Sequence, residues 1–566
     1  MKKFWRQKEP IKDYKETDSV IDKLIAVNNI EDRFRFLYPT EDELHSPYLL
    51  KNIEPARDRI IVALENKQKI SIFVDNDPDG ISSTALLFQY LNNYSDNVTY
   101  FHTQRSVGHG IQYALELIPS NTDLLIIVDS SSNEWESCRL ISEQGMDIIV
   151  IDHHLITDKN DYCILVNPQQ ESCQYPNKQS SGSLLTWKVC QTLDEYFHEN
   201  YSDSLIDLAA FGLYSDIQCM KEYENRFMVN HMLDNVQNIG LRSILKVIGK
   251  EKEKLYSSTF GYNITPFINA PTRLDKIELP LKLLTTEDPI LALKLAKEIK
   301  ILNEERKKFQ KEAVGRLRPL VNEQDKCIVL VDSSLGKGYN GLVANDLSSI
   351  YQRPVIIQGE SDMEYAGSFR SYGDFDFLKF VSELELVTNC GGHAGAGGIS
   401  FKKTDIDRIK LNLNSKLKNE KFEQMIEYDF ELKADEINEK IITQVQDFCR
   451  VSGTGFNEAK FLIKDLIVIQ KKILGSGEDT LKLGCLIESD TYFMDDNDFK
   501  KAKSSLVIMK FKADENFKDK VKIGDKIDVV GSLNLNLFPR YKPKYHIEKT
   551  KQIFIEDLRI IAGNEG

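Results

Sequence analysis

The stretch Ser71–Ala85 reads SIFVDNDPDGISSTA and decides how the first half of the chain folds. A short apolar run is followed by three aspartates at alternate positions, Asp75, Asp77 and Asp79, and then by Gly80 and a helical pattern. This order indicates a buried strand, a tight turn and the N-terminus of a helix. Carboxylates crowded at the end of a buried strand repel one another and resist dehydration, unless a cation lies among them.

Two interpretations of this turn are open on its own residues. Aspartate is common in polar turns, and its side chain caps the first amides of a helix. Hard divalent cations prefer oxygen ligands, so the same three carboxylates could form one wall of an Mg²⁺ or Mn²⁺ site. The rest of the chain must decide between a polar turn and a metal site.

Length and composition describe a multi-domain globular protein. The chain has 566 residues, with 41% hydrophobic and 28% charged residues, and we expect roughly three to five domains. It contains no apolar run of about 18 residues, which predicts that nothing spans a membrane, and the basic N-terminus does not resemble a secretory signal. Nine dispersed cysteines without a CxxC pair predict reduced thiols and a cytoplasmic protein.

The formal net charge of −14 argues against a protein coated in basic surface for non-specific binding of duplex nucleic acid. It does not exclude a nucleic-acid enzyme, because a metal ion held between acidic side chains and a phosphate supplies its own attraction.

Apolar strands alternate with helices from residue 71 to about 155, after a mostly helical region 1–70. This pattern predicts a parallel sheet with helices on both faces, in which ligands bind beyond the C-terminal ends of the strands. Three of these strands end in acids or histidines, in the segments VDNDPD, LLIIVDSSS and DIIVIDHH, and a predicted helix ends at Asp216. Their convergence favours the metal site over the polar turn.

The second half of the chain contains a helical region, a second α/β unit and a region of short strands. We predict helices over 224–262, a loop in INAPTRLDK, and a long charged helix over 281–318 that we interpret as a solvated connector. A second α/β unit begins at 327 and closes with NCGGHAGAGG, whose His393 is either structural or in contact with a ligand. Short alternating strands then predict a small β-barrel of the OB type.

The predicted barrel carries aromatic and basic residues that interleave along one strand. Such an edge suits stacking and phosphate contact with single strands, and a solvated strand with core aromatics is a nearly equal alternative. The residues are Phe538, Arg540, Tyr541, Lys542, Lys544 and Tyr545. The domain boundaries that we predict are 1–278, 279–320, 321–425 and 426–566.

Carboxylates and imidazoles together suit Mn²⁺, and accommodate Mg²⁺ with more waters. A pair of ions about 3.5–4 Å apart requires several such ligands, with one carboxylate shared between the ions. GKGYNG at 336–341 lacks the Lys-Ser/Thr ending of a phosphate-binding P-loop, which disfavours an ATPase.

Four segments in order, DNDPDG, IIVDSS, IDHH and GLYSDIQ, resemble the motifs of the DHH phosphoesterase superfamily. NCGGHAGAGG resembles the glycine-histidine motif of the domain that accompanies one branch of it. Within that branch, INAPTRL, LNEER and YAGSFRS resemble RecJ, a 5′→3′ exonuclease specific for single-stranded DNA. The resemblance implies two α/β lobes, a DHH parallel-sheet domain and a DHH-associated domain, joined by a long helix and followed by an OB-like β-barrel.

The resemblance also implies roles for single residues. The implied ligands of two Mn²⁺ or Mg²⁺ ions are Asp75, Asp77, Asp79, His153, Asp216 and the bridging Asp129. Asp152 would orient the imidazoles, and His154 would contact the scissile phosphate or the leaving group. A 5′-phosphate pocket is implied for Arg105, Arg273, Ser368 and Arg370, and a DNA phosphate contact for His393. Salt bridges for the arginines and a helix cap for Ser368 are the alternatives.

The implied activity is hydrolysis of single-stranded DNA to mononucleotides in DNA repair or recombination, by a monomer that works with a single-strand-binding protein or a helicase. A phosphoesterase of smaller substrates, such as a nanoRNase or a bisphosphate phosphatase, is one alternative, and residues 426–566 count against it. A catalytically silent DNA-binding scaffold is another, but all the motif acids are present.

Overall fold

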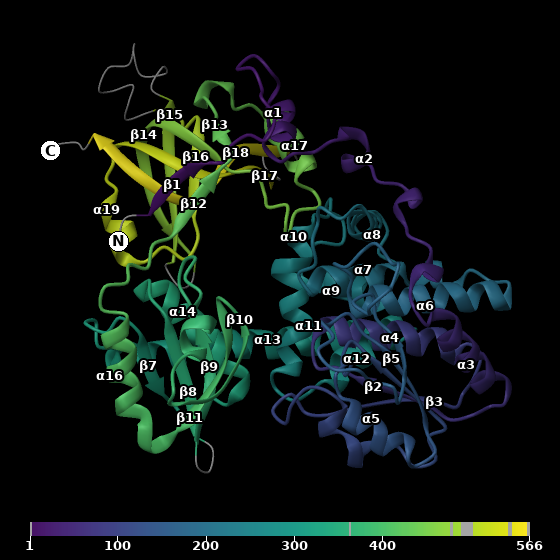
Figure 1. Ribbon diagram of the computed structural model, residues 1–566. Helices are drawn as coiled ribbons and strands as arrows, with labels where there is room; N and C mark the ends of the chain where they lie inside the picture. Colours follow the sequence, from purple (N-terminus) through teal and green to yellow (C-terminus); the bar gives the residue numbers. More distant parts are fainter. Residues whose placement is uncertain (1–2, 361–363, 476–478, 488–501, 541–545, 563–566) are drawn as a thin grey trace. The chain divides into compact units, whose positions relative to one another are not determined.

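The computed structural model describes residues 3–360, 364–475, 479–487, 502–540 and 546–562 (Figure 1). The chain divides into two compact units. Residues 34–312 and 450–456 form one, which we call the parallel-sheet unit; residues 1–33, 313–449 and 457–566 form the other, the mixed-sheet unit. The ranges of the four predicted domains stay predictions. None of the described helices combines the length and apolar character that a membrane crossing requires.

The parallel-sheet unit is built on five strands in the order β3-β2-β4-β5-β6, and all neighbours are parallel. The strands are β2 (Ile70–Val74), β3 (Val98–His102), β4 (Leu124–Val128), β5 (Asp147–Ile151) and β6 (Ile164–Val166). Every residue of β2 and β4 is buried, as expected for parallel strands covered on both faces. The predicted alternation of strands and helices over 71–155 is confirmed.

Helices enclose this sheet. On one face, Cys138 and Ile141 of α5 (Trp135–Ser142) pack against Phe73, Ile127 and Val150. The helices of the unit's remaining part are α3 (Ile53–Glu65), α4 (Pro78–Asn92), α6 (Gly182–Phe197), α7 (Ile206–Ser215), α8 (Tyr223–Asp234), α9 (Ile239–Val247), α10 (Ser257–Thr259), α11 (Thr265–Thr272) and α12 (Glu278–Thr285). The caps explain where two of them begin, because Asp77 caps α4 ahead of Pro78, and the Ser181 hydroxyl accepts the Leu184 amide of α6.

Two expectations for this region need correction. INAPTRLDK is not a loop, because α11 runs through its first five residues and Arg273 is the C-cap. Pro271 is tolerated because it lies in the last turn, and a π-helical segment, Phe260–Ile264, leads into α11. The charged segment 281–318 is not a purely solvated connector: α13 (Pro289–Leu317) buries Ala292, Ala296 and Ile299 along one side.

The mixed-sheet unit contains a second five-stranded sheet, in the order β10-β11-β9-β8-β7. Its strands are β7 (Ile328–Val331), β8 (Val355–Glu360), β9 (Glu364–Arg370), β10 (Val387–His393) and β11 (Ala396–Lys402). A core around Phe369, Phe377 and Phe401 packs α15 (Phe377–Ser382) and α16 (Ile406–Lys416) onto one face, while α14 (Lys337–Tyr351) packs against β8 and β9. The predicted second α/β unit is therefore confirmed.

The C-terminal part of this unit is the predicted OB-type sheet. Its strands are β13 (Phe430–Glu431), β14 (Phe461–Leu474), β15 (Thr480–Ile487), β16 (Leu506–Lys510), β17 (Lys526–Arg540) and β18 (His546–Ala562), with helices α17 (Glu439–Phe448) and α19 (Glu515–Lys520). Strand β17 also pairs with β14, so the sheet returns to an earlier strand. Phe538 is half exposed, whereas Tyr541, Lys542, Lys544 and Tyr545 lie outside the described residues.

Residues 1–70 hold one element that the expected helices do not include. Strand β1 (Phe4–Gln7) pairs in parallel with β12 (Met425–Tyr428), and the Trp5 indole donates to the Asp557 carboxylate over 3.0 Å. The helices that follow are α1 (Val20–Val27) and α2 (Arg33–Leu37). A four-residue strand whose partner lies more than 400 residues away leaves no periodic signal in the sequence.

Candidate metal centre

Three acidic residues follow three neighbouring strands of the parallel sheet at its C-terminal edge. Asp75 follows β2, Asp129 follows β4 and Asp152 follows β5. All three are at least nine-tenths buried, with exposed fractions of 6%, 2% and 0%. The sheet topology therefore places these carboxylates together and away from bulk water, which is costly for like charges.

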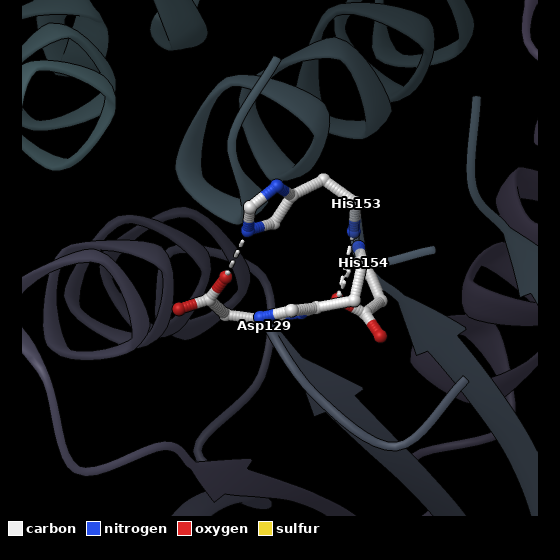
Figure 2. Close-up of side chains that lie close together, drawn as sticks. Asp129, His153 and His154 are labelled. Carbon is white, nitrogen blue, oxygen red and sulfur yellow. Dashed lines mark hydrogen bonds and ion pairs between the residues drawn. The ribbon is translucent and has the colours of Figure 1, made fainter. Parts of the chain in front are cut away.

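An imidazole and a helix end complete the cluster. Figure 2 shows the His153 ring directed at Asp129, with Nε2 of His153 3.2 Å from Oδ1 of Asp129. The same nitrogen lies 3.3 Å from Oδ2 of Asp216, at the C-terminus of α7. These approaches lack hydrogen-bond geometry: within the described part of the chain, Nε2 of His153 and Oδ1 of Asp129 are buried without a hydrogen-bond partner. A nitrogen and a carboxylate oxygen that face one another without a hydrogen bond have the arrangement of two ligand atoms with a cation between them.

Potential ligand atoms within 4.8 Å of one another form three groups in the described residues. Asp129 belongs to two of them, which is the position expected of a carboxylate shared by two ions. The groups are Asp75, Asp77 and Asp129; Asp79, His153 and Asp216; and Asp129, Asp152, His153 and His154. The roles that the family resemblance implies for these residues stay predictions.

The turn Asp75–Asp79 combines both interpretations that its sequence left open. Oδ1 of Asp77 accepts the amides of Asp79 (2.9 Å) and Gly80 (3.0 Å), so it caps α4, and Asp77 also lies in a ligand group. Asp79 accepts the amides of Gly182 (2.7 Å) and Ser183 (3.2 Å) at the N-terminus of α6. The positive end of α6 helps to hold this buried carboxylate in place.

Three glycines make room for three of the carboxylates, and of these only Gly80 was noted in the sequence, as part of the turn. A Cβ atom on Gly80 would lie 2.7 Å from Cβ of Asp75, and one on Gly182 would lie 2.6 Å from Oδ1 of Asp129. A Cβ atom on Gly212 would lie 2.4 Å from Oδ1 of Asp79. Any side chain at these positions would displace a carboxylate, and only the tertiary structure shows this.

Asp152 organises the segment that carries the two histidines. Its Oδ1 accepts Nδ1 of His154 (2.7 Å) and the amides of His153 (2.7 Å) and His154 (3.2 Å), while Oδ2 accepts the Ser132 amide (3.1 Å). It therefore orients the His154 ring, whereas its hydrogen bond to His153 is made with the backbone amide. Asn167, which follows β6 and was not anticipated, donates to the His154 carbonyl over 3.0 Å.

The protonation behaviour of the cluster follows from burial and crowding. Burial, followed by the charges of neighbouring aspartates, raises the pKa of Asp77 to about 6 and of Asp216 to about 8, and raises the pKa of Asp129 well above its ordinary value. Burial lowers the pKa of His153, which leaves a neutral ring with a lone pair to offer. The hydrogen bond to Asp152 raises the pKa of His154 to about 9. Without a cation, several of these carboxyls must hold protons.

The residues predicted to bind phosphate fall into both units. Nη1 of Arg105 donates to the Asn76 carbonyl (2.8 Å), and the Ser106 amide donates to Asp275 (3.1 Å), which joins the segments of Arg105 and Arg273. In the mixed-sheet unit, Ser368 and Arg370 occupy alternate positions of β9, and His393 is exposed at the end of β10. Ser368 lies within a strand and not at a helix cap.

Comparison with known proteins agrees with the motif order. Residues 69–213 match the DHH family, N-terminal domain; residues 324–419 match the DHHA1 domain; and residues 428–548 match the RecJ OB domain. The chain is a RecJ-like member of the DHH superfamily. The acidic cluster therefore lies within the residues that match the DHH domain, apart from Asp216, which lies three residues beyond them.

Relatives span nearly the full chain. The SPbeta prophage-derived protein YorK of Bacillus subtilis is 26% identical, with 96% of each chain covered. The single-stranded-DNA-specific exonuclease RecJ of Bacillus subtilis is also 26% identical, and the match covers 93% of this chain and 65% of that protein. The crystal structure of Thermus thermophilus RecJ with Mn²⁺ is 22% identical, with a TM-score of 0.75, and the likeness covers 96% of this chain and 76% of the other. This likeness shows the shared fold.

Proposed function

We propose that this protein is a metal-dependent exonuclease that degrades single-stranded DNA from the 5′ end to mononucleotides, in DNA repair or recombination. The observation that carries the proposal is the set of ligand groups that share Asp129, on a chain that continues into a RecJ OB domain. RecJ of Bacillus subtilis is a single-stranded-DNA-specific exonuclease, and the Thermus thermophilus RecJ structure contains Mn²⁺.

The residues at the sheet edge fit a pair of Mn²⁺ or Mg²⁺ ions, because carboxylates and a neutral imidazole are their usual ligands. His153, Asp79, Asp216 and Asp129 would hold one ion, and Asp75, Asp77 and Asp129 the other. When bound, two such ions activate a water molecule and neutralise charge on the phosphate.

The surrounding side chains would act on the substrate directly. His154, whose ring Asp152 holds through Nδ1, is charged at neutral pH and can donate from Nε2 to a phosphate oxygen or to the leaving oxygen. We propose that Arg105, Arg273, Ser368 and Arg370 each contact phosphate of the substrate, because guanidinium and hydroxyl groups donate hydrogen bonds to phosphate oxygens and the guanidinium charge balances the phosphate. His393 would contact a further DNA phosphate.

Both alternative functions have less support. A phosphoesterase of small substrates has no use for residues 428–548, which match the RecJ OB domain. A silent scaffold has no reason to keep crowded carboxylates whose pKa values are raised by burial. We retain the predictions of a cytoplasmic monomer, and of a single-strand-binding protein or a helicase as partner.

A product-length time course tests the proposed activity. The same single strand, labelled at the 5′ or at the 3′ end, is incubated with the protein and Mn²⁺, with EDTA as the control. The 5′ label should appear at once as a mononucleotide, while the 3′-labelled strand shortens step by step, and EDTA should stop both. Immediate release of the 3′ label, or cleavage confined to dinucleotides, would contradict the proposal.

Metal removal should make stability depend on pH. Asp77 and Asp216 titrate near 6 and 8 in the folded protein, against about 4 in an unfolded chain. Between pH 4 and pH 8 the unfolded chain therefore binds fewer protons than the folded protein. As a result, the stability of the metal-free protein falls as the pH rises through this range. The rise in unfolding temperature that Mn²⁺ causes should therefore be larger at pH 8 than at pH 6. Thermal scans with Mn²⁺ or EDTA measure it, and a shift independent of pH would argue against this cluster as the binding site.

A further inference from the structure

Ile217 has a backbone conformation that its side chain disfavours. It follows Asp216 directly at the end of α7, with φ of +61°. Helices commonly end on a residue in this left-handed region, but glycine or asparagine is the ordinary choice, because a Cβ atom crowds the following carbonyl. A β-branched residue there is a clear outlier.

Packing does not explain the choice of isoleucine. The side chain is 72% exposed, so it gains little from burial. The main chain fixes the conformation instead: the Ile217 amide donates to the Tyr214 carbonyl (3.2 Å), and the Met220 amide donates to the Thr454 carbonyl (2.7 Å). Asparagine could adopt the same turn with less strain. An outlier of this kind at the edge of a functional site is a reason to look for a role.

A second exposed apolar side chain follows the segment that carries His153 and His154. Leu155 comes directly after His154, is 75% exposed, and has its carbonyl held by Nδ2 of Asn133 (2.9 Å). The contact between His153 and Asp216 brings the two segments together. Leu155 and Ile217, which we call the apolar lip, thus each adjoin residues of the metal centre while facing solvent.

We propose that the apolar lip contacts the base of the nucleotide next to the scissile phosphate. This inference rests on the proposed function. A phosphate at the metal centre brings its sugar and base to the border of that centre, and aliphatic side chains such as leucine and isoleucine pack against the faces of bases. Such a contact also excludes water beside the phosphate, which strengthens the electrostatic interactions there. The lip therefore recognises a base without reading its identity.

The variant Ile217→Asn separates this role from a structural one. Asparagine relieves the backbone strain and removes the apolar contact. We expect its unfolding temperature to rise by about 2 °C and its Mn²⁺ affinity, measured by calorimetry without DNA, to stay unchanged. We expect the kcat/KM of the unmodified protein to be about 3- to 10-fold higher for strands with normal bases than for strands whose terminal nucleotides are abasic. The variant Ile217→Asn should lose most of this preference. Ile217→Val should keep that preference.

Ile290→Asn is the matched control, because Ile290 is 81% exposed at the start of α13, away from any predicted ligand in sequence. It should change neither the unfolding temperature nor the preference for bases. The inference is overturned if Ile217→Asn keeps the preference, if it melts at a lower temperature, or if the unmodified protein treats abasic strands like normal ones. Failure of the proposed function would look different, because the unmodified protein would then not hydrolyse single strands at all.

Discussion

Asp129→Asn should lower the hydrolysis of single-stranded DNA by roughly 10³-fold or more. Asp129 is the carboxylate that two ligand groups share, so its loss affects both proposed ions. Removal of an outer-shell partner of a metal ligand already costs about 10- to 100-fold, and loss of a shared ligand must cost more. Asparagine has nearly the same shape and tolerates the φ of +61° at this position, and it needs no more room beside Gly182.

The fold should survive this change, and the metal-free protein should gain stability. Burial and then the charges of neighbouring aspartates raise the pKa of Asp129, so the metal-free protein folds only at the cost of burying this charge or of taking up a proton, and asparagine requires neither. Thermal unfolding in EDTA should therefore show a higher midpoint for Asp129→Asn than for the unmodified protein. Asp161→Asn is the control, since Asp161 pairs with Lys159 at the surface. Activity within tenfold of the unmodified level would refute the shared-ligand assignment.

Lys188→Met should destabilise the parallel-sheet unit by about 3–5 kcal/mol, because it leaves a buried charge without a partner. Both Lys188 and Glu224 have no exposed side-chain surface, and Nζ of Lys188 lies 3.0 Å from Oε1 of Glu224. The same ammonium donates to the His45 carbonyl over 2.7 Å. Tyr175 and Asn177 also donate to Glu224, but neither carries the charge that balances it.

Urea unfolding followed by circular dichroism measures this loss. The double variant Lys188→Met with Glu224→Gln is the matched comparison, because it removes both charges. It should recover a large part of the lost free energy, since the cost of the single variant is mainly the unpaired carboxylate. A single variant that loses less than about 1 kcal/mol would show that water reaches Glu224 and that the pair is not truly buried.

Much of this molecule follows from local sequence pattern. Apolar strands that end in acids predicted the parallel sheet, and the rule that ligands bind at the C-terminal edge brought together Asp75, Asp129 and Asp152. The choice between helix cap and metal wall at Asp77 could not be made locally, because this carboxylate caps α4 through Oδ1 and also lies in a group of potential ligands.

What the sequence did not show depends on contacts between distant segments. Gly182 and Gly212 matter because α6 and α7 approach the carboxylates closely, and no local pattern records that distance. Asn167 supports the His154 carbonyl from the end of another strand. The helix over Thr265–Thr272 was missed, and its sequence contains Pro271, which is tolerated because it lies in the last turn.

We propose above all that two divalent ions bind at the C-terminal edge of the parallel sheet and share Asp129. Anomalous X-ray diffraction from crystals grown with Mn²⁺ tests it most directly. We expect two peaks, one within coordination distance of His153 and Asp216, the other within coordination distance of Asp75 and Asp77, with Asp129 touching both. A single ion, or ions bound elsewhere on the chain, would contradict it.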